Sequence, residues 1–222
     1  MAHRKILLKQ NNNPPPPKDK LISSPSKDTH LIKTKHQRIV DRACSLLFQK
    51  GYHLTTIREI ARTSDMSMGQ LYHYISTKDD ILYLVHKHMQ QLLYKHLEKS
   101  GVTKMENPLA ELVTALLYTL EFISKNKKLI QFVYTESKYL GKKHLRAILE
   151  MDDKNVVGFW RGILKDINKN NPMKGDLNFN ANLIAYLMVF FALRGWNLKD
   201  RSKKDNFILL TDFILRGLGI KK

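Results

Sequence analysis

The stretch from residue 55 to residue 83, TTIREIARTSDMSMGQLYHYISTKDDILY, has the pattern of two short helices around a tight turn and the start of a third. Thr56, followed by Glu59 three positions later, forms a capping-box pattern that supplies partners to the first amides of a helix. We expect this helix over residues 57–63. Its apolar residues, spaced i, i+3 and i+4, form one stripe that faces a core. They are Ile57, Ile60 and Ala61.

A second helix is expected over residues 68–75, after a turn at residues 64–66. Asp65 in the turn can adopt the left-handed backbone conformation at lower cost than most residues other than glycine. Ser67 is the expected N-cap of this second helix. Two apolar side chains one turn apart should point into the core. They are Leu71 and Ile75.

The opposite face of the second helix is small, polar and aromatic, and it suits the major groove of DNA. Gly69 allows the backbone to come close, and Gln70 can pair bidentately with adenine. Tyr72 and His73 can reach phosphates or base edges, and Lys78 at the start of the third helix can meet a phosphate. Together these pieces fit a helix-turn-helix, a DNA-reading motif. The expected DNA contacts are Thr55, Thr56, Ser67, Met68, Gly69, Gln70, Tyr72, His73 and Lys78.

Residues 35–90 resemble the N-terminal domain of the TetR/AcrR family of transcriptional regulators. The resemblance includes an earlier helix that closes at Gly51, and it implies sequence-specific binding to double-stranded operator DNA. Asp65 is the main departure, because the family usually carries glycine in this turn. The matching positions are Arg38, Ile39, Ala43, Leu47, Phe48, Gly51, Tyr52, Thr55, Thr56, Ile57, Ile60, Ala61, Ser67, Leu71, Tyr72, Lys78 and Asp79.

The composition agrees with a helical protein that has a core of its own. The chain has 222 residues, of which 43% are hydrophobic, so no disulfide or metal is needed to stabilise it. Its single cysteine, Cys44, lies in the apolar pattern of the first helix and is expected to be a small buried hydrophobe. One cysteine offers no disulfide framework, which agrees with a reducing cytoplasm.

The formal net charge of +18 favours a nucleic-acid partner, but its distribution does not locate the contact. The two halves of the chain carry similar basic excesses, and residues 66–75 contain no Lys or Arg. General lysine enrichment explains the charge at least as well as a dedicated basic patch. We expect no metal site, because His86 and His88, two apart on a helix, face different ways.

We divide the chain into an arm at 1–32, a DNA-binding domain at 33–93 and an effector-binding and dimerisation domain at 94–222. The arm holds four consecutive prolines and few residues able to pack, so we expect it to be disordered or polyproline-like. It either follows the DNA backbone with its basic residues or is a solvated tail. No secretion signal is visible. The longest apolar run, 183–193, has 11 residues and is too short to span a membrane, which needs about 20.

The rest of the chain shows a helical pattern and no alternating strand pattern of useful length. The expected fold is therefore all-α, with an N-terminal three-helix helix-turn-helix head and a C-terminal helical ligand-binding and dimerisation body. Pro108 should open one body helix from the favoured first-turn position. Helices are expected over about 82–99, 108–123, 127–140, 143–169, 179–198 and 205–218.

The resemblance implies that the body binds a small effector between its helices and forms a homodimer through its last two long helices. The helix over 179–198 supports this independently, because it is apolar on nearly all sides and must be buried on two of them. Arg194 continues one apolar face and needs a partner, either an anionic effector group or carbonyls and acids at the helix end. Aromatic residues at helical spacing are candidate pocket walls or plain core. The candidate ligand-binding residues are Tyr118, Phe122, Phe132, Tyr134, Phe159, Trp160 and Arg194.

The segments 192–196 and 213–217 resemble family members that control fatty-acid metabolism, which implies an acyl-CoA effector. Two other functions compete with a repressor. An enzyme would need a nucleophile elbow, a metalloprotease motif or a Gly-rich phosphate loop, and the sequence has none of these. We therefore expect no catalytic residues and no cofactor. An architectural or surface binder would depend on the basic arm, whereas a repressor would depend on Gln70 and Tyr72.

Overall fold

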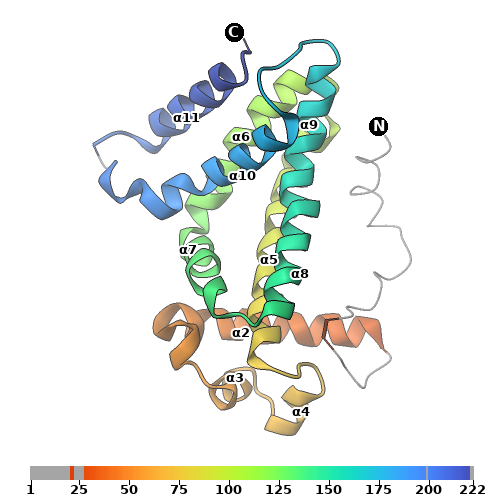
Figure 1. Ribbon diagram of the computed structural model, residues 1–222. Coiled ribbons are helices and arrows are strands. Elements are labelled where there is room, and N and C mark those ends of the chain that lie inside the picture. Colours follow the sequence, from red (N-terminus) through yellow and green to blue (C-terminus); the bar gives the residue numbers. More distant parts are fainter. Residues whose placement is uncertain (1–20, 23–27, 199, 221–222) are drawn as a thin grey trace. The chain divides into compact units, whose positions relative to one another are not determined.

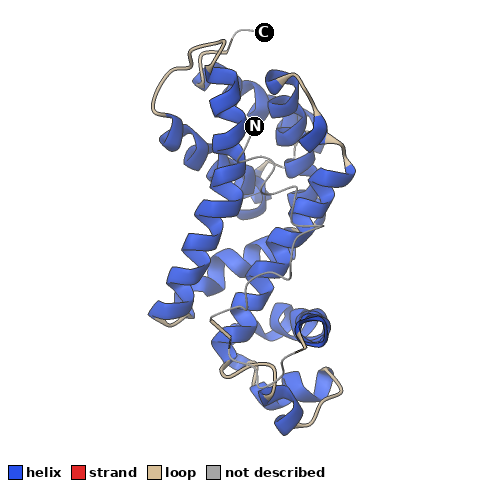
Figure 2. Cartoon of the chain, turned by 90° about the vertical axis from the view of Figure 1, so that its right-hand side faces the viewer, coloured by secondary structure: helices blue, strands red, loops and turns tan. Residues whose placement is uncertain are grey.

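The computed structural model describes residues 21–22, 28–198 and 200–220, and within them the chain is helical, without a β-strand (Figures 1 and 2). The predicted all-α fold is confirmed. The first described helices are α2 (Thr29–Leu54), α3 (Ile57–Thr63), α4 (Met68–Tyr72) and α5 (Lys78–Lys99). They are followed by α6 (Pro108–Lys125), α7 (Lys127–Glu136), α8 (Lys142–Asp152), α9 (Gly158–Asn168), α10 (Leu177–Arg194) and α11 (Lys203–Gly217). The shorter helical turns are η2 (Val102–Lys104), η3 (Ser137–Tyr139), η4 (Asp153–Val157) and η5 (Gly195–Asn197).

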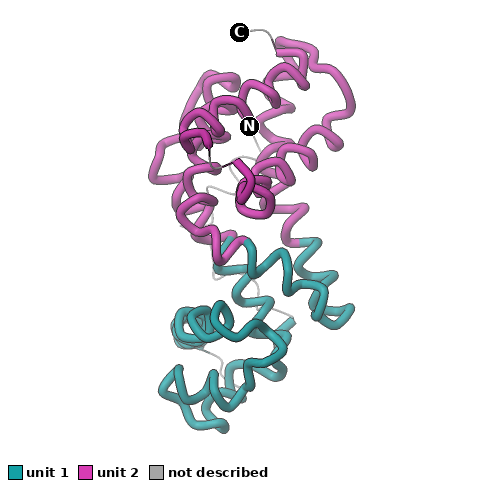
Figure 3. The backbone as a smooth tube through the Cα atoms, turned by 90° about the vertical axis from the view of Figure 1, so that its left-hand side faces the viewer, with its two compact units in different colours: residues 1–89, 131–150 teal, residues 90–130, 151–222 magenta. Residues whose placement is uncertain are grey.

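The chain divides into two compact units (Figure 3). Unit 1 contains the residues up to Met89 together with Gln131–Glu150, and unit 2 contains Gln90–Ile130 and Met151–Lys222. The segment 131–150, which the sequence-based division places in the C-terminal body, thus packs with the helices of the head. The division itself stays a prediction.

Unit 1 has a core of aliphatic side chains from α2, α3, α4 and α5. Helix α2 packs against α3, and α3 packs against α4. Leu71 and Ile75 are fully buried, as predicted. Cys44 is half-buried, and burial raises the pKa of its thiol to about 12, so it stays protonated and unreactive at neutral pH. Other buried members of this core are Ile39, Val40, Ala43, Leu47, Ile60, Ala61, Ile81, Leu82 and Val85.

Helix α2 begins four residues earlier than the sequence pattern indicated. The Asp28 carboxylate accepts the backbone N–H groups of His30 at 2.9 Å and Leu31 at 3.0 Å, which caps the helix before Thr29. The prediction of an unstructured arm up to residue 32 is therefore wrong for residues 29–32. Its remainder at residues 1–20 and 23–27 lies outside the described residues.

Unit 2 is organised around α6, which contacts α9, α10 and α11. Pro108 opens α6 as predicted, directly after the Asn107 N-cap. The inward stripe of α6 includes Leu112, Leu116 and Leu120, each at most 1% exposed. Because these residues recur every four positions, one face of α6 is buried along most of its length. The facing core residues include Trp160, Ile163, Ile184, Met188 and Ala192.

The predicted helix over 143–169 is interrupted by a π-helical turn. Helix α8 ends at Asp152, the turn η4 follows, and α9 starts at Gly158. The Asn155 side-chain amide donates to Gln90 Oε1 at 2.8 Å, so the turn places a polar contact on the α5 side of the helix. The regular apolar spacing of this segment gave no sign of such an interruption.

Helix α10 has one buried apolar face and one exposed apolar face. Ile184 and Met188 point into unit 2, whereas Leu183 is 42% and Tyr186 is 61% exposed. The segment Leu177–Asn197 is also long and apolar enough to cross a membrane by length and composition. Because its inner face belongs to the core of unit 2, the apolar character of α10 has a structural cause that needs no membrane.

Candidate nucleic-acid interface

Helix α3 is held at its start by the capping box that the sequence predicts. The Thr56 hydroxyl accepts the Glu59 N–H at 3.2 Å, and the Glu59 carboxylate accepts the Thr56 N–H at 2.9 Å. Lys50 from α2 reaches the same carboxylate at 2.5 Å. This lysine contact and the bonds from Thr56 lower the pKa of Glu59 to about 2. The start of α3 is thereby tied to α2.

The turn between α3 and α4 contains the only non-glycine residue with positive φ in the described part of the chain. Asp65 has φ of 54°, which confirms the predicted left-handed conformation. Its carboxylate pairs with Arg38 Nη2 of α2 at 2.8 Å. The Met66 N–H donates to the Ala61 carbonyl at 3.0 Å and closes the end of α3. An aspartate therefore fills the glycine position while its side chain anchors the turn.

Helix α4 starts at the predicted position but ends three residues before the predicted end at Ile75. Ser67 and Gln70 form a second capping box: the Ser67 hydroxyl accepts the Gln70 N–H at 3.1 Å, and Gln70 Oε1 accepts the Ser67 N–H at 2.9 Å. After Tyr72 the backbone continues as hydrogen-bonded turns, with the Ile75 N–H still donating to the Leu71 carbonyl at 3.1 Å.

The outward face of α4 agrees with the sequence analysis at most positions. Gly69, Gln70, Tyr72 and His73 are exposed, and the Tyr72 side chain is 46% exposed. Met68 is half-buried. While Gln70 holds the cap through Oε1, its Nε2 can donate to a base. The predicted bidentate pair with adenine requires Oε1 to accept from the base through its second lone pair while it accepts from the Ser67 N–H.

Two predicted contacts have structural roles that restrict access to DNA. Thr55 is only 1% exposed, and its hydroxyl donates to the Gly51 carbonyl at 2.8 Å, so it supports the last turn of α2, where the Gly51 backbone departs from helical geometry. Lys78 Nζ donates to the His53 carbonyl at 3.2 Å and lies 4.2 Å from the centre of the Tyr52 ring. Burial lowers the pKa of Lys78. Its ammonium reaches a phosphate only by leaving this carbonyl.

The start of α5 carries two carboxylates that join the reading helices to the segment 136–144 within unit 1. Asp80 accepts the N–H groups of Ser76 at 2.6 Å and Thr77 at 2.9 Å, and its other oxygen lies 2.6 Å from His144 Nε2. Asp79 accepts the Gly141 N–H at 2.9 Å. The contacts with Gly141 and His144 were not predicted, because these partners lie more than 60 positions away in the chain.

Tyr52 is the second connection between the head helices and this segment. Its hydroxyl donates to Asp79, and its backbone N–H donates to Glu136 Oε2 at 2.9 Å. Burial, followed by the hydrogen bond to Asp79, raises the pKa of Tyr52 above its usual range. The head and the segment 136–144 are therefore linked by several charge-assisted hydrogen bonds.

The candidate ligand-binding residues do not gather in one place. In unit 2, Tyr118 and Phe122 both contact the His96 ring, with centroids 5.8 and 5.7 Å away. Phe159 contacts the Trp160 ring edge-on, at a centroid distance of 5.1 Å. These pairs are parts of the packing of unit 2.

The other candidates lie apart from these pairs. Phe132 belongs to unit 1, where its ring lies 5.4 Å from that of Phe48. Tyr134, also in unit 1, is 43% exposed. Arg194 is exposed rather than held on an apolar face, and its guanidinium lies 5.6 Å from the centre of the Trp196 ring. The exposed end of α10 explains why this arginine needs no buried acid.

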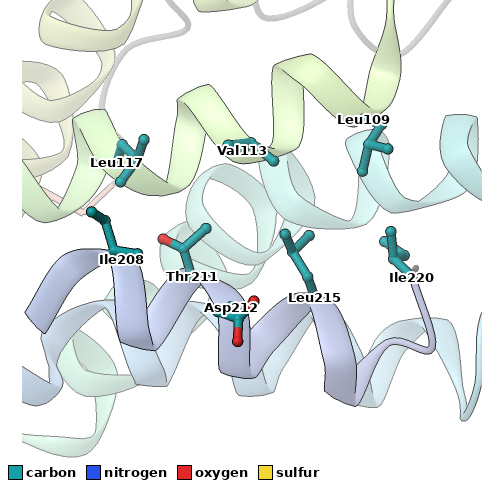
Figure 4. A pocket seen from close by; sticks show the side chains of 8 residues that line it. All are labelled: Leu109, Val113, Leu117, Ile208, Thr211, Asp212, Leu215 and Ile220. Atoms are coloured by element: carbon teal, nitrogen blue, oxygen red, sulfur yellow. The ribbon is translucent and has the colours of Figure 1, made fainter. Parts of the chain in front are cut away.

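Unit 2 contains a cavity that the sequence analysis did not anticipate. It lies between α6 and α11 and is lined by none of the candidate ligand-binding residues (Figure 4). The described residues contain no group of three or more His, Cys, Asp or Glu side chains that could hold a metal ion.

Comparisons with known proteins agree with a DNA-reading head. Residues 39–83 match the family described as bacterial regulatory proteins, tetR family. The transcriptional regulator HbdR of Aromatoleum sp. (strain CIB) is 26% identical over 89% of this chain and 83% of its own. The fatty acid metabolism regulator protein of Bacillus subtilis (strain 168) is 29% identical over 84% of this chain and 94% of its own. The structure of FadR from Bacillus subtilis with stearoyl-CoA matches 82% of this chain and 98% of its own, with a TM-score of 0.66 and 17% identity.

Proposed function

Since the chain belongs to the TetR family and is a DNA-binding transcriptional regulator, we propose that it is a homodimeric repressor that a small-molecule effector releases from operator DNA. The observation that carries this proposal is the exposed face of α4. It combines a glycine, an amide, a phenol and an imidazole on a helix that starts with its own capping box and follows the capped helix α3. We assign the reading of DNA to residues 33–93, and effector binding and dimerisation to residues 94–222.

In this proposal α4 enters the major groove and α3 supports it. Gly69 allows the helix backbone to approach the bases, and Gln70 donates through Nε2 to a base acceptor. Tyr72 and His73 contact phosphates or base edges. Because Thr55 is buried, its proposed role is to support the last turn of α2 at Gly51.

The homodimer is supported by the exposed apolar side chains of the last two long helices. Phe179 and Tyr186 on α10 are 64% and 61% exposed, and Leu209 and Phe213 on α11 are 48% and 65% exposed. Large apolar side chains in such numbers on one pair of helices are typical of an interface. A two-fold dimer presents two copies of α4 to successive faces of the duplex.

The effector response is supported by the contacts of residues 136–144 with the head. This segment is joined in the chain to α6 through α7, and to α9 through the rest of α8 and η4. A ligand that displaces these body helices also displaces Gly141 and His144, which bind Asp79 and Asp80 at the start of α5. The separation of the two reading helices would then no longer match the half-sites, and affinity for the operator would fall.

For the effector we propose an acyl-CoA. FadR from Bacillus subtilis has been solved with stearoyl-CoA, and the related regulator of fatty acid metabolism shares 29% of its residues with this chain. Residues 101–222 contain 9 more basic than acidic side chains, and this positive charge also suits a polyanionic ligand. The chain then works in the cytoplasm, where both its DNA and its effector are found, and no catalytic role is assigned to it.

Gln70→Glu is the sharpest test of DNA reading, because glutamate keeps the capping box and removes the amide donor. We expect an unchanged melting temperature and a loss of at least about tenfold in affinity for the promoter DNA of the protein's own gene. Binding is measured by fluorescence anisotropy at one fixed salt concentration, with and without acyl-CoA.

The matched control is Glu59→Gln, which makes the reverse exchange in the capping box of α3 and should bind DNA nearly as well as the wild type. Equal DNA affinities for Gln70→Glu and the wild type would contradict a reading role for α4.

A further inference from the structure

We propose that the groove between α6 and α11 binds an uncharged, mostly hydrocarbon molecule that carries one hydrogen-bonding group. This ligand differs from the acyl-CoA proposed above as the effector, because it carries no charge. The groove is defined by one side of α11 and the facing side of α6, both within unit 2 (Figure 4).

The walls of the groove are almost entirely aliphatic. Leu109, Val113 and Leu117 recur every four residues on α6 and line one side, and Ile208 and Leu215 of α11 line the other. The cavity measures about 230 Å³. A cavity of about 150 Å³ with similar walls binds benzene, so this groove has room for roughly eight to ten non-hydrogen atoms.

Thr211 gives the groove a single polar contact. The residue is 6% exposed, it lines the cavity, and its side chain points from α11 toward α6 (Figure 4). Its hydroxyl oxygen is buried and has no hydrogen-bond partner among the described residues. A buried hydroxyl without a partner is unfavourable, so a ligand that offers one hydrogen bond at this point gains affinity.

Charge excludes an anionic head group from this groove. Asp212 is the only charged residue that lines it, and its carboxylate already pairs with Arg216 Nη2 at 2.5 Å. A ligand carboxylate would meet a like charge beside apolar walls. An aliphatic alcohol satisfies all three conditions, because it has a hydrocarbon body, one hydrogen-bonding group and no charge. Ile208, which is 47% exposed, lies at an open part of the groove and allows entry.

The occupant would also act on the surface that we propose for the homodimer, and this consequence alone rests on the proposed function. Thr211 and Leu215 face the groove, whereas Leu209 and Phe213 of the same helix are exposed. A ligand between α6 and α11 therefore contacts the helix that carries part of the dimer surface.

The test uses the full chain labelled at its Ile, Leu and Val methyl groups and titrated with 1-octanol. We expect saturable NMR shifts confined to the methyl groups that line the groove, which belong to Leu109, Val113, Leu117, Ile208, Leu215 and Ile220. Sodium octanoate, which has the same chain length, should bind at least about tenfold more weakly, because its carboxylate must be desolvated beside Asp212. No DNA is present, so failure of operator binding would leave this result unaffected.

Two matched variants identify the role of the hydroxyl. Thr211→Val keeps the shape of the side chain and should weaken octanol binding by about three- to tenfold. Thr119→Val makes the same change at a threonine of α6 that is also buried without a partner among the described residues but does not line the groove, and it should bind like the wild type. Equal affinities for octanol and octanoate, shifts centred on methyl groups outside the groove, or no effect of Thr211→Val would each overturn the proposal.

Discussion

Asp65 shows how one side chain can replace a glycine in a tight turn. Its backbone has φ of 54°, a conformation that costs an ordinary L-residue about 1–2 kcal/mol. Aspartate tolerates it better than most residues, and the ion pair with Arg38 at 2.8 Å holds the side chain against α2. Both partners are exposed, so this pair contributes at most about 1 kcal/mol.

The backbone, rather than the ion pair, should dominate the effect of substitutions at this position. We expect Asp65→Val to lower the free energy of unfolding by about 1–2 kcal/mol, because a β-branched residue is strained at positive φ. Asp65→Gly should stay within about 0.5 kcal/mol of the wild type, since relief of strain offsets the lost ion pair and the added chain entropy. Urea unfolding measures both. A glycine variant as unstable as the valine variant would show that the ion pair matters more.

His86 is the buried histidine of α5, and its environment predicts how stability depends on pH. The side chain is 7% exposed, and its Nε2 lies 3.0 Å from the Ser137 hydroxyl, which donates to the Val133 carbonyl. The histidine therefore donates from Nε2 to the Ser137 oxygen. Burial lowers the pKa of His86 to about 4.

Stability should fall as the pH is lowered from about 6.5 to about 4. In this window the unfolded chain binds a proton at this histidine and the folded chain does not. The contribution of His86 to the free energy of unfolding is therefore fully present above pH 6.5 and is lost by about pH 4. The free energy of unfolding should fall by about 3 kcal/mol over this range of pH. We expect His86→Asn to remove this part of the pH dependence in urea unfolding at pH 7, 5.5 and 4. The exposed His30→Asn serves as control and should keep the wild-type profile.

The start of α5 is the element that joins the reading helices to residues 136–144. Asp80 is 2% exposed and is shared by Ser76, Thr77 and His144, so its removal leaves buried donors without an acceptor. We expect Asp80→Ala to lower the free energy of unfolding by about 2–3 kcal/mol. Asp153→Ala, which removes an exposed partner of Arg161, should cost less than about 1 kcal/mol. If urea unfolding shows similar losses of stability for Asp80→Ala and Asp153→Ala, the contacts of Asp80 do not hold the reading helices to residues 136–144.

The whole molecule should bind DNA as a dimer, and the salt dependence of binding reports this. If a dimer neutralises about eight phosphates, the logarithm of affinity should fall against the logarithm of salt concentration with a slope near −7. The double variant Tyr186→Glu with Phe213→Glu places charges on the exposed apolar faces of α10 and α11. We expect it to sediment as a monomer, with a slope of about half that value.

Leu149→Glu is the control for this experiment, because Leu149 is 59% exposed on α8 and outside the proposed interface. It should stay dimeric in analytical ultracentrifugation. A wild-type chain that is monomeric at micromolar concentration, or a flat salt response, would refute the dimeric repressor.

The sequence alone determined the features that depend on neighbours in the chain. The capping box at Thr56, the N-cap at Ser67, the left-handed Asp65 and the buried Leu71 and Ile75 were all predicted, because each depends on residues within a few positions. The tertiary structure decided the features that join distant segments. These include the burial of Thr55, the contacts of Asp79 and Asp80 with residues 141 and 144, and the groove between α6 and α11. Periodicity identifies which face of a helix is buried, but it does not identify the partner, because packing between segments depends on the path of the whole chain.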